Sequence, residues 1–289
     1  MKKSNKPLLR AGIIIAAAFV LIIAVIMFNP VQEKSSSEAG RFPAVPVQPE
    51  PVIPEPSPVP EPQKPAKTIY IILDDGGHNL EQLKPFLEFP GKLTVAVLPH
   101  LAYSAEAAEA VHAAGKTVIL HQPMEAIGKN NPGPGAIYVS MNSDEVKSIL
   151  RKNLDSVPHA EGLNNHMGSA ATMDLKVMDS VMEVVKERGI FFIDSFTHSK
   201  SVCSEVAEKH GLAIAKRDVF LDNVDTKEKI MEAINQGKET ADKKGYAVMI
   251  GHVWSQELAD TMMEIYPDFI EEGYCFGSAA DFFILKDKE

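Results

Sequence analysis

Ile71-Ile72-Leu73-Asp74-Asp75-Gly76-Gly77 ends a short apolar run that begins at Thr68. The run is brief and rich in β-branched residues, and two glycines follow it, so it predicts a buried β-strand rather than a helix. Two adjacent carboxylates stand where that strand ends. Adjacent charges are costly inside a core unless a cation pairs with them, and a metal ion would do so. A solvated turn is the alternative, because Asp-Gly is common turn chemistry.

Strand-like and helical segments alternate from Thr68 onward. The strand-like runs are residues 68–73, 93–98, 117–120, 162–165, 190–193, 212–215 together with 219–221, and 246–250. The helical segments are residues 104–114, 143–156, 175–188, 226–244 and 255–271. This alternation predicts parallel β/α units. Seven or so such units without a second shift in composition predict a single β/α barrel, closed or nearly closed. An open doubly wound sheet is the alternative.

Five of these strands close on a polar side chain that suits metal binding or proton transfer. In β/α barrels the carboxyl ends of the strands form one rim, where the chemistry gathers. One histidine after a strand is more often a hydrogen-bonded structural residue. Five such ends on one rim instead predict a site, made of Asp74, Asp75, His121, Asn165, His166, Asp194, Ser195 and His252.

Two of these strand ends have informative neighbours. In His121-Gln122-Pro123-Met124-Glu125, the proline suits the first turn of a helix, which would place His121 and Glu125 on one helix face. In Leu163-Asn164-Asn165-His166-Met167-Gly168-Ser169, three consecutive polar side chains would make a poor core, although a helix cap is the alternative. Carboxylate and imidazole ligands with an open position are typical of catalytic zinc or a related divalent metal.

The charge balance limits the partners of the globular part. Of the 29 basic and 39 acidic residues, eight and five precede Thr68, so the remainder carries 21 and 34 and a net charge of −13. Such a domain should repel nucleic acid and anionic lipid surfaces. We therefore expect no nucleic-acid partner. The two cysteines, Cys203 and Cys275, have no metal spacing and are expected as free thiols, unless an oxidising compartment pairs them.

The first 67 residues predict a membrane attachment. Residues 1–29 combine a basic flank with 18 uncharged, apolar residues at 11–28, long enough to span a bilayer. The basic flank should stay in the cytoplasm, so residues 68–289 should lie outside it. A cleaved signal peptide, which would leave a secreted protein, is the alternative. Residues 30–67 hold ten of the 20 prolines between Arg41 and Lys67 and predict an extended linker.

Residues 67–285 resemble the divergent polysaccharide deacetylases, relatives of the metal-dependent carbohydrate deacetylases. The resemblance rests on the Leu73–Gly77 stretch, the His121 and Asn164 runs quoted above, Phe192-Ile193-Asp194-Ser195 and Ile250-Gly251-His252. It implies a distorted seven-stranded β/α barrel. The family's Arg-x-Pro-Tyr motif has no counterpart in this chain.

The resemblance also implies roles for single residues. The first Asp of the family's pair, a base, falls on Asp74, and the second, a metal ligand, falls on Asp75. The His-x-x-x-His metal motif falls on His121 and Glu125, so the chain departs from it. We expect His166 as the third ligand, with Glu125 as the alternative. The late Leu-x-His that supplies the acid is similar to Ile250-Gly251-His252.

The resulting expectation is a monomeric, metal-dependent hydrolase that deacetylates a polysaccharide of the cell envelope. Zinc would be held by Asp75, His121 and His166, with Asp74 as base and His252 as acid. Asp194 would orient an imidazole. Substrate-binding or supporting roles fall to Glu125, Asn165, Gly168, Ser169, Asp194 and Ser195. A catalytically silent, membrane-tethered carbohydrate-binding module is the alternative. A phosphoesterase is disfavoured, because only Lys216 and Arg217 offer cations near the rim.

Overall fold

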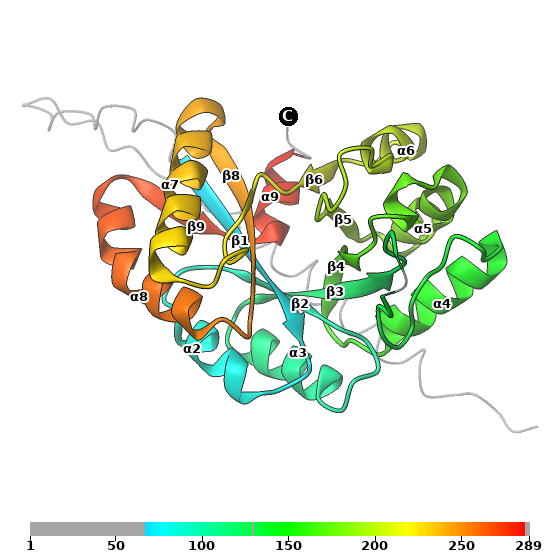
Figure 1. Cartoon of the computed structure of the whole chain (residues 1–289), viewed down its shortest axis with the longest axis horizontal. Helices are drawn as coiled ribbons and strands as arrows, with labels where there is room; N and C mark the ends of the chain where they lie inside the picture. Colours follow the sequence, from blue (N-terminus) through cyan, green and yellow to red (C-terminus); the bar gives the residue numbers. More distant parts are fainter. Residues whose placement is uncertain (1–66, 129, 287–289) are drawn as a thin grey trace, which may run out of the picture. The chain divides into compact units, whose positions relative to one another are not determined.

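The computed structural model describes residues 67–128 and 130–286, shown in Figure 1. The strands are β1 (Lys67–Gly76), β2 (Thr94–Val97), β3 (Thr117–Met124), β4 (Ala160–Met167), β5 (Phe191–Asp194), β6 (Ile214–Lys216), β7 (Val219–Phe220), β8 (Tyr246–His252) and β9 (Tyr274–Gly277). The helices are η1 (Glu81–Leu83), α2 (Lys84–Glu88), α3 (Ser104–Ala113), α4 (Ser143–Asp155), η2 (Ala171–Met173), α5 (Leu175–Arg188), α6 (Cys203–His210), α7 (Lys227–Lys244), α8 (Gln256–Glu271) and α9 (Ala279–Lys286).

The strands form one curled parallel sheet in the order β6-β5-β4-β3-β2-β1-β8-β7. Within this order, and apart from β6 and β7, strands that follow one another in the chain are neighbours in the sheet, and β1 lies beside β8. This is the strand order of a barrel and not of a doubly wound sheet. The predicted number of seven strands is wrong, because eight strands form the path, and of the predicted closed or nearly closed forms the barrel has the open one, because no ladder joins β6 to β7 in the described residues. β6 and β7 are therefore the two edges of the sheet, joined only through the chain at Arg217 and Asp218. The sheet is an open barrel. The ninth strand, β9, pairs with the start of β1 from Lys67 to Tyr70.

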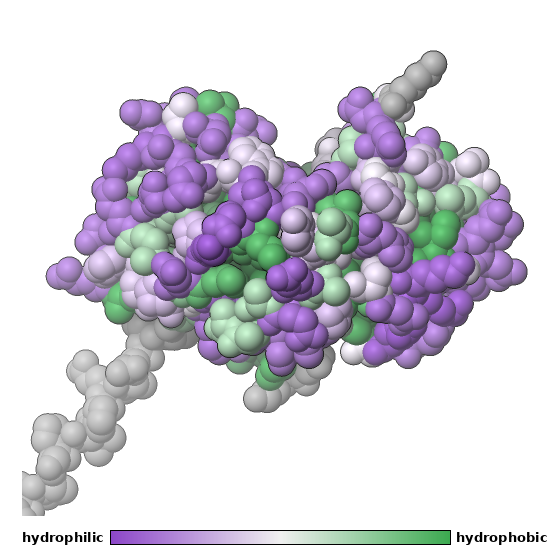
Figure 2. All heavy atoms as spheres, turned by 90° about the horizontal axis from the view of Figure 1, so that it is seen from below, coloured by the Kyte–Doolittle hydropathy of each residue, from purple (hydrophilic) through white to green (hydrophobic). Residues whose placement is uncertain are grey.

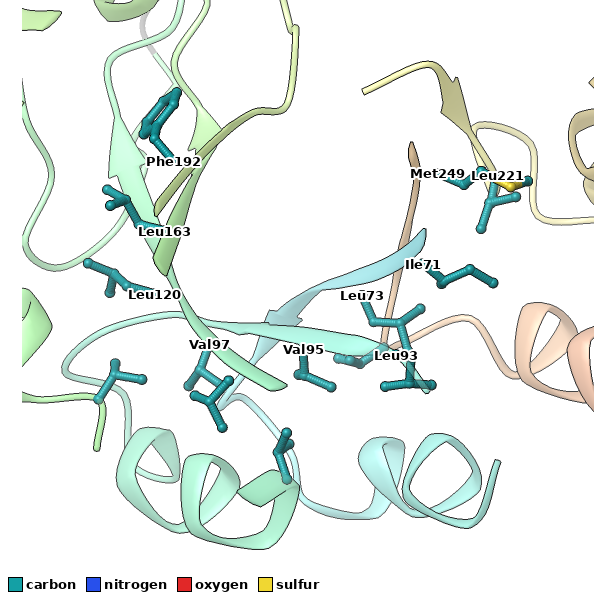
Figure 3. Packing of buried hydrophobic residues seen from close by; sticks show 14 of the residues in the cluster. Ile71, Leu73, Leu93, Val95, Val97, Leu120, Leu163, Phe192, Leu221 and Met249 are labelled. Atoms are coloured by element: carbon teal, nitrogen blue, oxygen red, sulfur yellow. The ribbon is translucent and has the colours of Figure 1, made fainter. Parts of the chain in front are cut away.

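Two cores follow from the alternation of side chains along each strand. Ile69, Ile71 and Leu73 of β1 belong to the outer core, in which the convex face of the sheet packs against the surrounding helices (Figure 3). Tyr70 and Ile72 face the concave side and pack in a second core with Phe282 of α9. The last helix therefore fills the inside of the curled sheet, as Figure 1 shows. Neither β9 nor α9 was predicted.

The helices that cover the outer core start and end close to the predicted residues. Asn142 caps α4, and its side chain and that of Glu145 form the predicted capping box. Gly189 ends α5 in the left-handed conformation, with a φ of 63°. The face of the molecule shown in Figure 2 is mostly hydrophilic, with hydrophobic residues gathered toward its middle. The predicted α/β class and helix positions are confirmed.

The predicted N-terminal segments lie almost wholly outside the described residues. The anchor or signal at 1–29 and the linker at 30–67, apart from Lys67, therefore stay predictions. None of the helices in the described part of the chain has the length and apolarity needed to cross a membrane. Cys203 and Cys275 are free thiols, the first buried and the second half-buried.

Candidate metal centre

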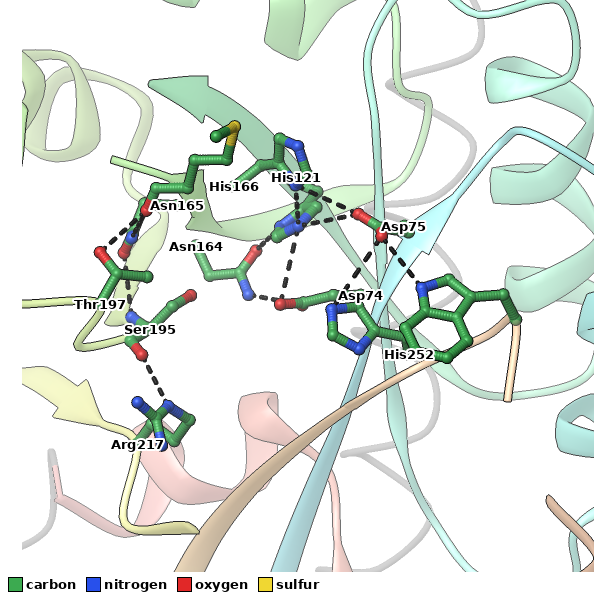
Figure 4. A network of polar contacts seen from close by, with 12 residues as sticks. Asp74, Asp75, His121, Asn164, Asn165, His166, Ser195, Thr197, Arg217 and His252 are labelled. Carbon is green, nitrogen blue, oxygen red and sulfur yellow. Dashed lines mark hydrogen bonds and ion pairs between the residues drawn. The ribbon is translucent and has the colours of Figure 1, made fainter. Parts of the chain in front are cut away.

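The polar side chains at the carboxyl ends of the strands meet on the concave face of the sheet. Along β1, Tyr70 and Ile72 face inward, so the same alternation turns Asp74 inward. His252 is the direct neighbour of Asp74 in the ladder between β1 and β8. His121 is paired in the same way with Asn164 across β3 and β4. Figure 4 shows these side chains pointing toward one another from four strands.

Asp75 joins this group because its backbone departs from the strand. Its φ is 66°, in the left-handed region that residues other than glycine seldom adopt. The pairing of β1 with β2 also shifts between Leu73 and Gly76. Regular alternation would point Asp75 to the opposite side from Asp74. The left-handed residue instead brings both carboxylates to one site, and such strain is common where function demands it.

Three side-chain atoms of Asp75, His121 and His166 form a compact triangle. Oδ1 of Asp75 lies 3.4 Å from Nε2 of His121 and 3.1 Å from Nδ1 of His166. The two ring nitrogens are 3.1 Å apart. Ligands placed tetrahedrally at about 2.0–2.2 Å from a zinc ion are separated by roughly 3.3–3.6 Å, close to these distances. The three residues could therefore hold a metal ion.

The environment of Asp75 also fits a cation. Its Oδ1 atom is buried and has no hydrogen-bond partner, which is a costly state for a carboxylate oxygen in the absence of a positive charge. Burial raises the pKa of Asp75, but interactions with His121 and His166 outweigh that effect and lower the pKa below its usual range. The carboxylate is thus charged and directed at the two imidazoles.

Asn164 connects His121 to Asp74. Nδ1 of His121 lies 2.7 Å from Oδ1 of Asn164, an oxygen that can only accept, so the ring nitrogen donates. Nε2 of His121 is then directed at Asp75 and His166, and in the neutral ring this nitrogen carries the lone pair that a metal requires. Nδ2 of Asn164 donates to Oδ1 of Asp74 at 2.7 Å. Burial raises the pKa of Asp74 above its usual value, although His121 and His252 act in the opposite direction.

His252 is oriented by Asp222, a residue that the sequence did not single out. Oδ1 of Asp222 lies 3.0 Å from Nδ1 of His252, and Oδ2 accepts the backbone N–H of His252 at 2.7 Å. Burial lowers the pKa of His252, but the hydrogen bond and charge of Asp222, with smaller effects of Asp74 and Asp75, raise it overall. The strand-like run 219–221 ends directly before Asp222, so this carboxylate could have been found as another strand-end residue.

Asp194 was expected to orient an imidazole, and this expectation is wrong. Its Oδ1 accepts the N–H of Phe196 at 2.8 Å, and its Oδ2 accepts the hydroxyl of Ser201 at 2.7 Å. Strand alternation places Ile193 on the concave face, so Asp194 points to the opposite side and cannot reach the histidines. It stabilises the turn after β5.

Asn165, Ser195 and Arg217 support the rim beside this turn. Oδ1 of Asn165 accepts the backbone N–H of Ser195 at 2.9 Å. The guanidinium group of Arg217 donates to the carbonyl oxygens of Ser195 and Phe196 at 2.7 and 3.0 Å. Figure 4 shows Arg217 reaching the loop that carries Ser195. These contacts fix the ends of β4 and β5 relative to each other.

Glu125 lies away from the triangle. Its Oε2 accepts the backbone N–H of Val139 at 2.7 Å, so the carboxylate holds the long loop that leads to α4. The predicted helix that would place it on one face with His121 is wrong, because β3 continues through Pro123 to Met124. Beyond Leu120 the pairing with β2 has ended, so the missing N–H of Pro123 breaks no ladder on that side. The structure brings His166, and not Glu125, to the other two candidate ligands.

Gly168 and Ser169 shape the loop after β4. Gly168 has a φ of +85°, and a Cβ atom there would meet Cβ of Met124 at 3.1 Å, so glycine suits both the conformation and the close packing. The hydroxyl of Ser169 accepts the N–H of Ile127 at 2.9 Å. Both residues tie the loop to the end of β3, near the candidate ligands but not among them.

Comparison with known proteins gives both a family and a fold. The profile of the family described as divergent polysaccharide deacetylase matches residues 71–282. The Escherichia coli (strain K12) protein YibQ, described as uncharacterized, is 33% identical over 187 residues, which cover 65% of this chain and 59% of that protein. The chain thus matches about three fifths of that relative's length.

Two solved structures share the fold. An uncharacterized protein of Agrobacterium tumefaciens C58 matches with a TM-score of 0.72 at 16% identity, over 76% of this chain and 90% of that one. A structure described as T48 deacetylase with substrate matches with a TM-score of 0.50 at 10% identity, over 76% of this chain and 92% of that one. At such identities the likeness concerns the fold alone.

Proposed function

Because the chain belongs to the divergent polysaccharide deacetylase family, we propose that it is a metal-dependent hydrolase that removes acetyl groups from a polysaccharide of the cell envelope. One observation carries the proposal: a triangle of Asp75, His121 and His166 lies beside a buried carboxylate, Asp74, and a histidine held by a carboxylate, His252. A base, an acid and a cation site are the groups that hydrolysis of an amide or ester requires.

Zinc is the proposed metal, since two imidazoles and one carboxylate leave one open position in a tetrahedral shell, as in catalytic zinc sites. When bound, the cation would polarise the acetyl carbonyl and make the attacking water more acidic. Asn164 would keep His121 in the required tautomer. The side chains of the site then have to transfer two protons, one away from the attacking water and one to the leaving atom of the sugar.

Asp74 is proposed as the base. Asn164 occupies its Oδ1, which leaves Oδ2, 3.6 Å from Nε2 of His121, for the proton of the attacking water. The raised pKa of Asp74 makes it a stronger base than an exposed carboxylate. As the proton leaves the water, its oxygen forms a bond to the acetyl carbon.

His252 is proposed as the acid. Asp222 binds Nδ1, so Nε2, which lies 4.0 Å from Oδ2 of Asp75, faces the site. When the bond from the acetyl carbon to the sugar nitrogen or oxygen breaks, Nε2 would donate its proton to that leaving atom. Acetate and a free amine or hydroxyl are the products, and the proton taken up by Asp74 restores His252 through solvent.

The test uses the purified chain with added Zn²⁺ and a set of N- and O-acetylated glycans, and it measures released acetate. A chelator should abolish the release and zinc should restore it. Release that persists unchanged in the chelated protein would contradict the metal-dependent mechanism. Binding of glycan without acetate release would instead establish the carbohydrate-binding module, the rival function.

The place of action is part of the proposal. The apolar segment at 11–28 and the proline-rich linker would hold the enzyme outside the cytoplasmic membrane, where envelope polysaccharide is found. Cleavage of the segment would release it as a secreted enzyme. We propose a monomer whose partners are the polysaccharide and, through the N-terminal segment, the membrane.

A further inference from the structure

Trp254 is the only tryptophan of the chain, and it stands at the edge of the candidate site. It lies two residues after the end of β8 and is 43% exposed. Its neighbours are fixed on both sides. The N–H of Val253 donates to the carbonyl of Asp74 at 3.0 Å, and Ser255 caps α8 through the N–H of Leu258 at 2.9 Å. The exposed indole is therefore held in a defined place.

The edge of the indole contacts the candidate metal ligand. Nε1 of Trp254 donates to Oδ2 of Asp75 at 3.3 Å. The two oxygens of this carboxylate thus face different groups, because Oδ1 is directed at the nitrogens of His121 and His166. Groups that bind the second oxygen of a ligand carboxylate fix its orientation toward the metal.

One face of the indole packs against the candidate acid. The rings of Trp254 and His252 are stacked, with centroids 4.8 Å apart and an angle of 20° between their planes. Phe220 lies near the same imidazole, with its centroid at 5.2 Å. The position of His252 is therefore defined by two aromatic rings and by Asp222.

The position of the sugar follows from the proposed reaction. His252 would give its proton to the nitrogen or oxygen that remains on the sugar, so the sugar ring must lie within a bond or two of that imidazole. Trp254 borders this imidazole, and the part of the indole that His252 leaves uncovered is exposed. A pyranose ring presents C–H groups on its face, and an indole face carries the negative side of a quadrupole, so the two surfaces attract each other.

We propose that Trp254 seats the sugar that carries the acetyl group and at the same time positions Asp75 toward the metal. This inference rests on the proposed deacetylase function. A neutral sugar also suits a domain with a net charge of −13 better than an anionic ligand does. Two substitutions separate the two roles: Trp254→Phe keeps an aromatic face and removes the N–H, and Trp254→Ala removes both.

The first experiment measures the affinity of the full chain for Zn²⁺ by competition with a chromogenic chelator. Both variants lack the N–H, so both should bind Zn²⁺ about 10- to 100-fold more weakly than wild type. Met263→Ala is the matched control, because Met263 lies on α8 and is exposed to a similar extent, 44%. If both Trp254 variants bind Zn²⁺ with wild-type affinity, the proposal that Trp254 positions Asp75 is overturned.

The second experiment measures KM for an oligomer of N-acetylglucosamine at saturating Zn²⁺, so that weaker zinc binding does not contribute. Trp254→Phe should stay close to wild type, and Trp254→Ala should raise KM roughly 3- to 10-fold. In the wild-type chain the oligomer should also change the fluorescence of the single tryptophan. An unchanged KM in Trp254→Ala overturns the role in sugar binding.

The two experiments also separate this inference from the proposed function. If no acetylated glycan releases acetate, the deacetylase function and the role in sugar binding fail together. The zinc affinities still decide whether Trp254 positions Asp75, because they do not depend on activity.

Discussion

Asp222 holds His252 by accepting two hydrogen bonds, one from the ring nitrogen Nδ1 at 3.0 Å and one from the backbone N–H at 2.7 Å. The carboxylate side chain of Asp222 is fully buried, so the pair is shielded from solvent on that side. A buried carboxylate that accepts from an imidazole favours the protonated ring. The relationship makes His252 the candidate acid of the site and leads to the first prediction.

Asp222→Asn should shift the alkaline limb of the pH–rate profile to lower pH. The pKa of His252 is raised in the folded protein, and an acid acts only while it is protonated. Activity is therefore present below that pKa and is lost as pH rises through it. Without the carboxylate the pKa falls, and the loss begins earlier. The measurement is kcat/KM for acetate release against pH.

Asp218→Asn is the control for this experiment. Asp218 lies on the same segment and accepts from Lys244 and from the N–H of Val248, with no histidine among these contacts. The alkaline limb of the pH–rate profile of Asp218→Asn should stay at the wild-type position. If the limb of Asp222→Asn also stays there, Asp222 does not set the protonation of the acid.

Asp74 and Asp75 should respond differently to the same substitution. Asp75→Asn removes a charge that faces both imidazoles and should release the metal. Asp74→Asn should keep the metal and lower kcat by about 10²–10⁴-fold, the usual contribution of a general base. Metal content by elemental analysis and acetate release test both. The opposite pattern, with metal lost from Asp74→Asn alone, would exchange the two roles.

His166→Ala should abolish tight metal binding, whereas Glu125→Gln should leave it nearly unchanged. The ring of His166 is 3.1 Å from Asp75 and from His121, but the carboxylate of Glu125 binds the N–H of Val139. An amide oxygen can still accept that hydrogen bond, so the loop should be retained in Glu125→Gln. Equal metal content in wild type and His166→Ala would contradict the assignment.

Asn164→Ala should weaken zinc binding by about 10- to 100-fold, because His121 loses the group that fixes its tautomer. Asn164→Asp keeps an oxygen acceptor for His121 and should bind zinc far better than Asn164→Ala. It also places a second carboxylate next to Asp74, where the amide now donates at 2.7 Å. Two neighbouring carboxylates raise the pKa of one of them, so the acid limb of the pH–rate profile should move to higher pH. Similar zinc affinities in the two variants would exclude the tautomer role.

Protease added to intact spheroplasts should digest residues 68–289. The reason is the order of the N-terminal segments, with a basic flank before 18 apolar residues. Lysed cells serve as the control for protease sensitivity of the folded domain. Complete protection in intact cells together with digestion after lysis would place the domain in the cytoplasm.

The sequence predicted the repeating β/α units and the helix ends, because capping boxes and C-terminal glycines act locally. It did not decide whether the barrel closes. Closure depends on how β6 and β7 diverge around Arg217 and Asp218, and no local pattern encodes that. Strand β9 was missed since Cys275 and Phe276 are only half-buried and the strand is four residues long.

The site was predicted in part, and the alternation of side chains explains the remainder. Side chains two residues apart along a strand share a face, so the inward-facing Ile72 places Asp74 inward and the inward-facing Ile250 places His252 inward. The same rule applied to Ile193 excludes Asp194. Asp75 could not be placed by this rule, because its left-handed backbone cancels the alternation at one residue.

The position of β1 in the sheet has a consequence for how the chain folds. The strand that carries Asp74 and Asp75 is the first of the domain, yet its ladders join it to β8 and β9, about 180 to 210 residues later. Contacts between residues so distant in sequence slow folding, because a long loop must close before they form. The first strand therefore remains without two of its three partners until nearly the whole domain has been synthesised, and His252, which lies on β8, can join the candidate site only then.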